Sequence, residues 1–202
     1  MKKAFVFGGG VYDGQFPVIC PEDFIIAADA GHEILEKHGI TPHITVGDFD
    51  SSEKIPSVNV IKLPVEKDVT DTYAAVNIAL EKGCDEIYIY GGMGGRPDHT
   101  FANYTIIAQL SEKGIKAFLF GEGYVVTAVC CGKISLKGKK GKTVSVFSWS
   151  EKCEGVSLAG LKYTLSDAVL INSFALGVSN SFEAEKAEIS VKNGTLIIMT
   201  EL

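Results

Sequence analysis

The first half of the chain alternates short apolar runs with stretches that repeat apolar positions at helical spacing. Short apolar runs bounded by turn residues predict buried strands, and the helical repeat predicts amphipathic helices. The expected strands are 3–7, 24–28, 44–46, 58–63, 86–90 and 115–120, and the expected helices are 31–38, 70–82 and 100–113. This alternation predicts an α/β fold in which a mainly parallel sheet is covered on both faces.

The pattern changes after residues 121–123. Short strand-like runs follow, separated by Gly and Lys, and Asn193-Gly194 between two apolar runs is a hairpin signal. The expected strands are 124–130, 133–136, 143–149, 168–172, 188–191 and 196–200. No further helix is predicted, so the second half reads as an all-β sandwich. We therefore expect two domains, 1–122 and 123–202.

Composition narrows the class of protein. The chain has 202 residues, 46% of them apolar, and a net charge of -6. The apolar content predicts a packed core. The negative net charge argues against a non-specific nucleic-acid binder and against a membrane-surface binder, because both need basic patches. No apolar run is long enough to span a bilayer, and the N-terminal run is too short for a signal peptide. The odd count of five cysteines without CxxC spacing fits a cytoplasmic protein.

The stretch Gly47-Asp48-Phe49-Asp50-Ser51 carries the first chemical signal. Asp48 and Asp50 are two residues apart, so an extended backbone directs both carboxylates to one side. Such a pair repels unless a cation lies between the groups, and Mg²⁺ is the natural one because it binds carboxylate oxygens together with substrate phosphates. An acidic, solvated turn is the alternative.

Polar and glycine-rich residues follow five of the predicted strands. In an open parallel sheet these strand ends meet at one edge, where ligands bind. The residues concerned are Gly8 to Gly10, Asp29, Asp48 with Asp50, Asp68 to Asp71, and Gly91 to His99. This convergence favours a phosphate and metal site over a structural surface.

Several of these candidate site residues also have a purely structural explanation. Asp29 suits a turn and helix cap, and Asp68 suits a helix dipole as well as a ligand. Asp71 favours ligation, because a third acid completes one face of a metal shell. Arg96 after a run of glycines suits phosphate oxygens. His99 is as compatible with capping or the core as with catalysis.

Gly141-Lys142-Thr143 looks like the end of a P-loop. The required earlier glycine is replaced by Leu136, and the residues that follow predict a strand rather than a helix. We therefore interpret 137–142 as a basic, solvated hairpin turn.

The motifs together resemble those of the thiamine pyrophosphokinase family. They are Ala28 to Gly31, Gly47 to Ser51, Lys67 to Asp71, Gly91 to His99, Gly160 to Tyr163 and Ser179-Asn180. The resemblance implies a catalytic α/β domain that binds ATP and Mg²⁺ (1–122) and a thiamine-binding β-sandwich (123–202). It also implies a homodimer whose active sites lie at the subunit interface. The implied reaction transfers pyrophosphate from ATP to thiamine, giving thiamine diphosphate and AMP.

The resemblance also implies residue roles. Asp48, Asp50 and Asp71 would bind Mg²⁺, and Arg96 would stabilise charge on the transferred group. Asp29 and Asp98 would orient phosphates or accept the hydroxyl proton, a choice that stays open. The nucleotide-binding set is Asp29, Asp68, Thr70, Gly91, Gly92, Arg96 and His99, and the thiamine-binding set is Tyr163, Ser179 and Asn180.

Two other functions fit part of the pattern. A Mg²⁺-dependent nucleotide phosphohydrolase would need the Asp48 and Asp50 pair but not the residues of the second half. A non-enzymatic sensor of thiamine or nucleotide would need binding groups but not the complete acidic set.

Overall fold

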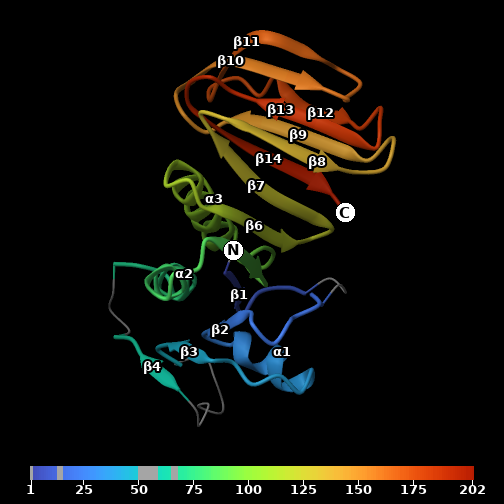
Figure 1. Cartoon of the computed structure of the whole chain (residues 1–202). Coiled ribbons are helices and arrows are strands. Elements are labelled where there is room, and N and C mark those ends of the chain that lie inside the picture. The colour runs from blue at the N-terminus through green and yellow to red at the C-terminus, as the bar shows by residue number, and fades with distance from the viewer. Residues whose placement is uncertain (1, 13–15, 50–58, 65–67) are drawn as a thin grey trace. The chain divides into compact units, whose positions relative to one another are not determined.

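The structure is a computed structural model that describes residues 2–12, 16–49, 59–64 and 68–202. The chain forms two compact units (Figure 1). Unit 1 comprises residues 1–103 and 117–122, and unit 2 comprises residues 104–116 and 123–202. The functional domains 1–122 and 123–202 stay a prediction.

Unit 1 is built on a mainly parallel sheet, which confirms the predicted α/β class. The strand order is β6-β5-β1-β2-β3-β4, and β1 pairs in parallel with both β5 and β2. β2 pairs in parallel with β3, and β3 with β4. The strands are β1 (Lys3–Phe7), β2 (Phe24–Ala28), β3 (Ile44–Gly47), β4 (Val60–Lys62), β5 (Glu86–Tyr90) and β6 (Lys116–Gly121).

Helices pack on this sheet and bury the apolar side chains of its strands. Alternate strand residues face opposite sides, so Phe5, Phe7 and Ile25 form one cluster with Leu35 of α1 (Gly31–Lys37). α2 (Asp71–Glu81) contacts β1, β2 and β3 and buries Ala75, Val76 and Ala79. In open sheets of this kind, ligands bind beyond the carboxyl ends of the strands.

The third helix begins earlier than predicted. We expected it at Thr100, but α3 is Pro97–Glu112. Proline is favoured at the first helical position, where its missing N–H costs no hydrogen bond, and Asp98 then complements the helix dipole. Asp98 and His99 therefore lie in the first helical turn and not in a loop.

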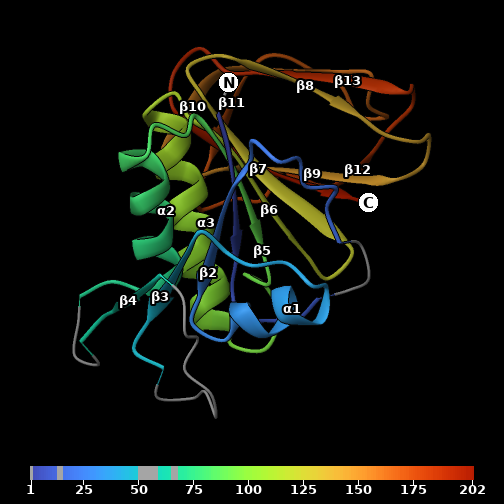
Figure 2. The ribbon, with the colours of Figure 1, turned by 60° about the horizontal axis from the view of Figure 1, so that its bottom comes forward.

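Unit 2 contains two layers of antiparallel strands, visible in Figure 2. One layer has the strand order β12-β9-β14-β7, and the other is a four-stranded sheet with the order β11-β10-β13-β8. The strands are β7 (Tyr124–Cys130), β8 (Lys133–Lys137), β9 (Thr143–Ser148), β10 (Lys152–Ala159), β11 (Leu165–Ile171), β12 (Gly177–Ser181), β13 (Lys186–Ser190) and β14 (Thr195–Glu201).

Both sheets of unit 2 supply one apolar core. Val146 of β9 and Ile198 of β14 come from one sheet, and Leu158 of β10 and Ile189 of β13 come from the other. The predicted β-sandwich is therefore confirmed.

Two strands of unit 2 were missed by sequence reasoning. No strand was predicted over Gly177–Ser181, yet it forms β12 beside β9 with an irregular register. β10 was not predicted, because glycine and serine interrupt its apolar positions. Pairing with neighbouring strands, rather than local propensity, makes these segments extended.

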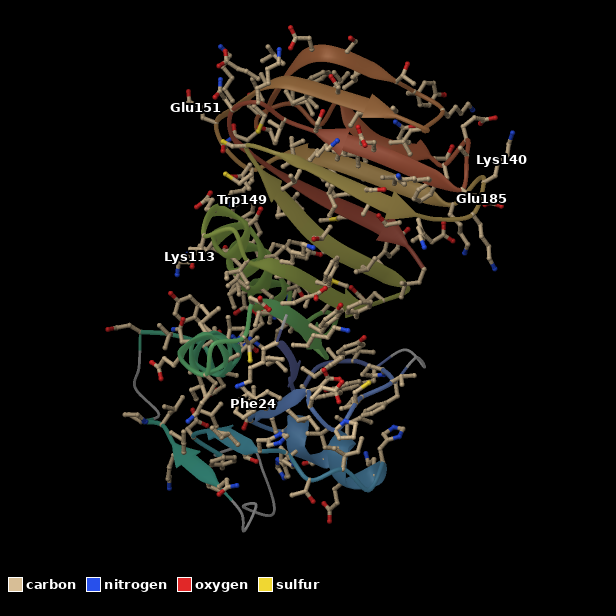
Figure 3. All side chains as sticks on the ribbon, viewed as in Figure 1. Phe24, Lys113, Lys140, Trp149, Glu151 and Glu185 are labelled. Carbon is tan, nitrogen blue, oxygen red and sulfur yellow. The ribbon has the colours of Figure 1, made fainter. Side chains whose placement is uncertain are left out.

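The basic stretch 137–142 lies between β8 and β9, and Lys140 projects from this end of unit 2 (Figure 3). Lys140 forms an ion pair with Glu183, and its side chain is exposed. No phosphate loop exists here, as predicted, since β9 and not a helix follows. Among the described residues, no helix has the length and apolar character needed to cross a membrane.

Candidate active site

A cavity of about 380 Å³ opens in unit 1. Its size suits a small-molecule ligand. The residues that line it and were predicted for the site are Asp29, Thr70, Asp71, Gly91, Gly92, Arg96 and His99. Gly9, Gly10, Ala30, Thr72, Gly94, Gly95 and Asn103 complete the wall. Residues after β1, β2 and β5 and at the starts of α2 and α3 therefore meet at one place.

Asp29 leaves the end of β2 in a left-handed conformation, with φ of 50°. Its N–H donates to the carbonyl of Val46, at 2.8 Å. Gly47 lies against it, because a Cβ on Gly47 would be 3.0 Å from the Cα of Asp29. The ends of β2 and β3 are thus adjacent, and Asp48 follows directly. Asp48 is half-buried but is not part of the cavity wall, and Asp50 lies outside the described residues.

Backbone contacts between two glycine segments form one wall. The N–H groups of Gly8 and Gly10 donate to the carbonyls of Tyr90 and Gly91, both at 2.8 Å. A Cβ on Gly8 would be 2.9 Å from the carbonyl oxygen of Gly91, and one on Gly10 would overlap that same oxygen. Only glycine allows this approach without displacement of the chain.

Tyr12 supports this wall from behind. Its hydroxyl donates to the carbonyl of Gly8 at 2.7 Å, and a Cβ on Gly91 would be 2.7 Å from its ring. Burial raises the pKa of Tyr12 well above its ordinary value, so the hydroxyl keeps its proton and remains a donor. Tyr12 thereby connects the two glycine segments, a role that the sequence did not reveal.

The start of α2 forms another part of the cavity wall. Thr70 is the N-cap residue, and its hydroxyl accepts a hydrogen bond from the N–H of Tyr73 at 3.2 Å. This cap places Asp71 and Thr72 in the cavity wall. The Oδ1 atoms of Asp71 and Asp29 are both buried from solvent. Asp68 is exposed and lies outside the wall, so its predicted nucleotide contact stays a prediction.

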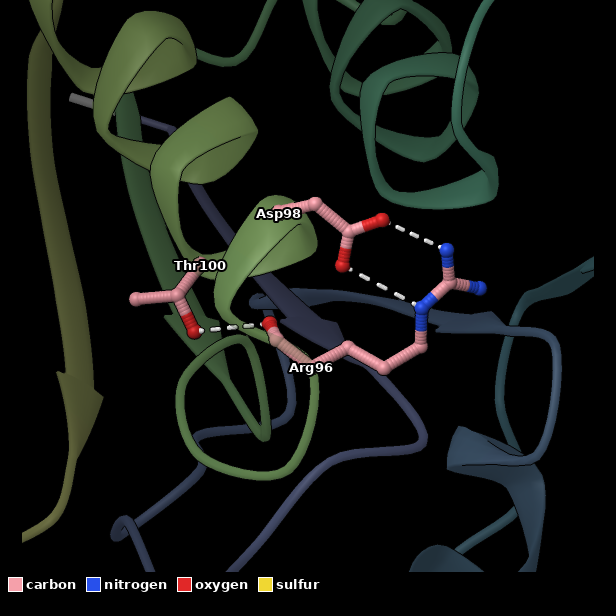
Figure 4. Close-up of polar contacts among 3 residues, drawn as sticks. All are labelled: Arg96, Asp98 and Thr100. Carbon is pink, nitrogen blue, oxygen red and sulfur yellow. Dashed lines mark hydrogen bonds and ion pairs between the residues drawn. The ribbon is translucent and has the colours of Figure 1, made fainter.

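Arg96 and Asp98 form an ion pair at the start of α3 (Figure 4). The carbonyl of Arg96 accepts hydrogen bonds from the N–H and the hydroxyl of Thr100, so the backbone of Arg96 is fixed to the helix. The hydrogen bond from Arg96 holds the pKa of Asp98 below its usual range. The ion pair therefore favours the charged form of the Asp98 carboxylate.

Asn103 was missed by sequence reasoning. It is 4% exposed, and its Nδ2 donates to the carbonyl of Gly92 at 2.6 Å. It follows His99 by four residues on α3, a spacing that places both on one face of the helix and could have signalled it. Thr72 was also missed, and it lines the cavity next to Asp71.

The donor set suits a hard cation together with a phosphate. Carboxylates of Asp29 and Asp71, glycine backbone and a guanidinium surround the same cavity. Within the residues that the structure describes, no three His, Cys, Asp or Glu side chains gather in a metal-binding arrangement. The proposed ligand Asp50 is outside that set.

The three residues predicted to bind thiamine lie in unit 2. Tyr163 is 60% exposed, and the Nζ of Lys162 lies 5.3 Å from its ring centroid. Ser179 is exposed, with φ of 58°, and its N–H donates to the hydroxyl of Ser145. Asn180 is buried, and its side chain bonds the backbone of Tyr163. The structure therefore brings Tyr163 and Asn180 together.

Comparisons with known proteins agree with this arrangement. The family model "Thiamin pyrophosphokinase, catalytic domain" matches residues 18–119, and "Thiamin pyrophosphokinase, vitamin B1 binding domain" matches residues 133–196. The thiamine pyrophosphokinase of Bacillus subtilis is 29% identical over 184 residues, which cover 86% of this chain and 85% of that protein. Thiamin pyrophosphokinase 1 of Caenorhabditis elegans is 27% identical over 190 residues, covering 87% and 77%.

Solved structures show the same fold. A crystal structure of thiamine pyrophosphokinase from Bacillus subtilis aligns with a TM-score of 0.88 and 26% identity over 99% of both chains. That of thiamin pyrophosphokinase from Geobacillus thermodenitrificans aligns with a TM-score of 0.82 and 25% identity, covering 100% of this chain and 98% of that one. This chain belongs to the thiamine pyrophosphokinase family.

Proposed function

We propose that this protein transfers a pyrophosphoryl group from ATP to the hydroxyethyl oxygen of thiamine, giving thiamine diphosphate and AMP. The observation that carries the proposal is the cavity of unit 1, where acids, glycine backbone and Arg96 converge at the carboxyl ends of parallel strands. The two family models, matched in order along the chain, add the thiamine-binding part.

The cavity suits the triphosphate of ATP. Residues at the N-termini of α2 and α3 line it, and helix N-termini favour anions. Arg96 lines the cavity and would pair with phosphate oxygens, and Gly91 and Gly92, also in the wall, would contact the nucleotide through their backbone. Asp29, Thr70 and His99 complete the nucleotide contacts, with Asp68 as an outer member of the set.

The carboxylates of Asp48, Asp50 and Asp71 are the proposed ligands of Mg²⁺. When bound, the ion would neutralise the charge of the triphosphate and polarise the phosphorus under attack. Arg96 would stabilise negative charge on the transferred group, with Asp98 fixing its guanidinium.

Tyr163 is the proposed platform for thiamine. Its ring is exposed, so a flat heterocycle could stack on the face that Lys162 does not cover, and a cationic thiazolium is attracted to an aromatic face. Ser179 of β12 is exposed and has a left-handed backbone conformation. It is the proposed hydrogen-bonding partner of the aminopyrimidine.

We further propose a cytoplasmic homodimer in which unit 2 of one copy supplies the thiamine contacts to unit 1 of the other. Unit 2 exposes large apolar side chains along β11 and β12 and between them: Val169, Ile171, Phe174, Leu176 and Val178. An apolar patch of this kind is typical of a protein interface.

The deciding experiment measures AMP, ADP, phosphate and thiamine diphosphate formed from ATP and Mg²⁺, with and without thiamine. AMP formed only with thiamine, and in step with thiamine diphosphate, is the expected result. Release of ADP or phosphate regardless of thiamine would replace the proposal with a phosphohydrolase. Binding of both ligands without turnover would replace it with a sensor.

A further inference from the structure

The turn that carries Tyr163 is attached to the segment after β12. The N–H of Lys162 donates to the carbonyl of Ser181 at 2.9 Å, and the N–H of Glu183 donates to the carbonyl of Gly160 at 3.0 Å. Leu161 and Phe182 form a bridge between the two segments, and both are buried. The start of the turn is therefore fixed to the core of unit 2.

Among the residues that the structure describes, none forms a main-chain hydrogen bond with Tyr163, and the side chain of Asn180 bonds its backbone instead. Oδ1 of Asn180 accepts hydrogen bonds from the N–H groups of Tyr163 and Ser181, both at 2.9 Å. Nδ2 of Asn180 donates to the carbonyl of Tyr163 at 2.6 Å. The amide thus bonds both polar groups of the Tyr163 backbone, as a neighbouring strand would.

These bonds use most of what Asn180 can offer. A carboxamide oxygen accepts about two hydrogen bonds, and both are taken by backbone N–H groups. The side chain is buried, with 4% of the residue exposed, whereas 60% of Tyr163 is exposed. Asn180 therefore faces the protein, and the ring of Tyr163 faces solvent.

We propose that Asn180 is a positioning residue that acts through Tyr163 and does not itself contact thiamine. This rests on the proposed function, and it departs from the sequence-based expectation that Asn180 bonds the aminopyrimidine. Holding the backbone of Tyr163 rigid reduces the conformational entropy lost when thiamine stacks on the ring. Loss of the Asn180 amide then weakens thiamine binding only as far as Tyr163 contributes to it.

The test is a double-mutant cycle with Asn180→Ala, Tyr163→Ala and the double variant, read as KM for thiamine at saturating ATP. We expect Asn180→Ala to raise KM roughly three- to tenfold, with a smaller change in kcat. The double variant should have the same KM as Tyr163→Ala alone, because Asn180 acts only through the Tyr163 ring, which that variant already lacks. If the KM increase of the double variant equals the product of the two single increases, the proposal is overturned. Asn193→Ala, which removes an exposed amide of the same unit, is the control.

A thiamine analogue with oxygen in place of the pyrimidine amino group separates the two roles further. A positioning role predicts the same fold increase in KM for thiamine and analogue in Asn180→Ala. A smaller increase for the analogue would show that Asn180 contacts the amino group directly, and would overturn the proposal.

Hydrogen exchange of backbone amides tests the positioning without turnover. In Asn180→Ala the Tyr163 N–H should lose protection, while the Lys162 N–H, bonded to Ser181, keeps it. Unchanged protection of Tyr163 overturns the proposal even if the protein does not act on thiamine. Should Asn180→Ala fail to fold, Asn180→Asp is read in its place: it keeps an acceptor oxygen, and the charged oxygen that replaces Nδ2 repels the carbonyl of Tyr163, so the Tyr163 N–H should again lose protection. If the wild type shows no thiamine turnover, the proposed function fails, and hydrogen exchange still decides the role of Asn180.

Discussion

The carboxylate of Asp98 accepts two hydrogen bonds from the guanidinium of Arg96, from Nε at 3.2 Å and from Nη2 at 2.6 Å. Two parallel bonds fix the plane of the guanidinium as well as its position. Both side chains are exposed, yet Arg96 lines the cavity. The pair therefore orients Arg96, the proposed phosphate-binding group, in the wall of the cavity.

The first prediction concerns Asp98→Asn and pH. Because the pKa of folded Asp98 is lowered, the ion pair is present above the ordinary aspartate pKa of about 3.9 and is lost only as pH falls through the lower value. Turnover by Asp98→Asn should fall by roughly tenfold through misplacement of Arg96. The pH profile from about pH 6 to about pH 9 should keep its shape, since Asp98 does not titrate there. A shifted acid limb would instead identify Asp98 as a catalytic base.

The second prediction concerns Asp71→Asn. The amide keeps the size of the side chain but removes a charged ligand from the cavity, so turnover should fall at least about 100-fold. The melting temperature should change little, which circular dichroism would check. Glu81→Gln, at the exposed end of the same helix, is the matched control and should keep full activity. Near-normal AMP formation by Asp71→Asn would exclude the metal assignment.

A third prediction follows from Asn103. In Asn103→Asp a buried carboxylate would face the carbonyl oxygen of Gly92, now without a donor. We expect a loss of about 1–3 kcal/mol in the free energy of unfolding and a higher KM for ATP. Denaturant unfolding and ATP kinetics measure the two effects. Gln109→Glu, an amide-to-acid change at a half-buried position of α3, is the control, and an equal loss there would refute a specific role for Asn103.

Gly10→Ala gives the fourth prediction. The new Cβ would overlap the carbonyl oxygen of Gly91, so the two glycine segments must separate. Such overpacking costs about 1–3 kcal/mol, and the KM for ATP should rise with it. In Gly132→Ala the Cβ would be 3.4 Å from its nearest neighbour, the carbonyl oxygen of Cys130, so this control should be tolerated. Unaltered ATP kinetics in Gly10→Ala would show that the glycine wall does not touch the nucleotide.

The last prediction tests shared active sites. Asp71→Asn inactivates unit 1, and Tyr163→Ala impairs unit 2, so each variant alone should have low activity. If each site combines two subunits, mixed dimers regain one intact site, and a refolded equimolar mixture should recover about a quarter of wild-type activity. Activity that equals the mean of the two separate variants would place both residues in the same chain's site.

The sequence allowed the fold to be predicted because most elements carry strong local signals. β1, β2 and β5 are continuous apolar runs, and α2 has both an N-cap at Thr70 and a glycine after its end. The segment 177–181 has no such signal, and only its pairing with β9 makes it a strand. Its side chains are small and polar, so local propensity predicts a loop.

Site residues with distinctive chemistry were likewise predictable. Asp29, Asp71 and Arg96 line the cavity because parallel strands end together and helices begin there. Tyr12 and Asn103 were missed, because their role is to bond the backbone carbonyls of Gly8 and Gly92, and only the folded chain brings these groups together. Asn103 alone left a signal in the sequence, its spacing of four residues from His99.

The close backbone contact between Gly10 and Gly91 has a consequence for how the site can evolve. A wall made of main chain cannot be reshaped by exchanging side chains, since any Cβ there collides with its neighbour. Adaptation to a different nucleotide must therefore arise at the wall positions that carry side chains, such as Thr72, His99 and Asn103. A library designed to alter nucleotide choice should vary these three positions and leave the glycines constant.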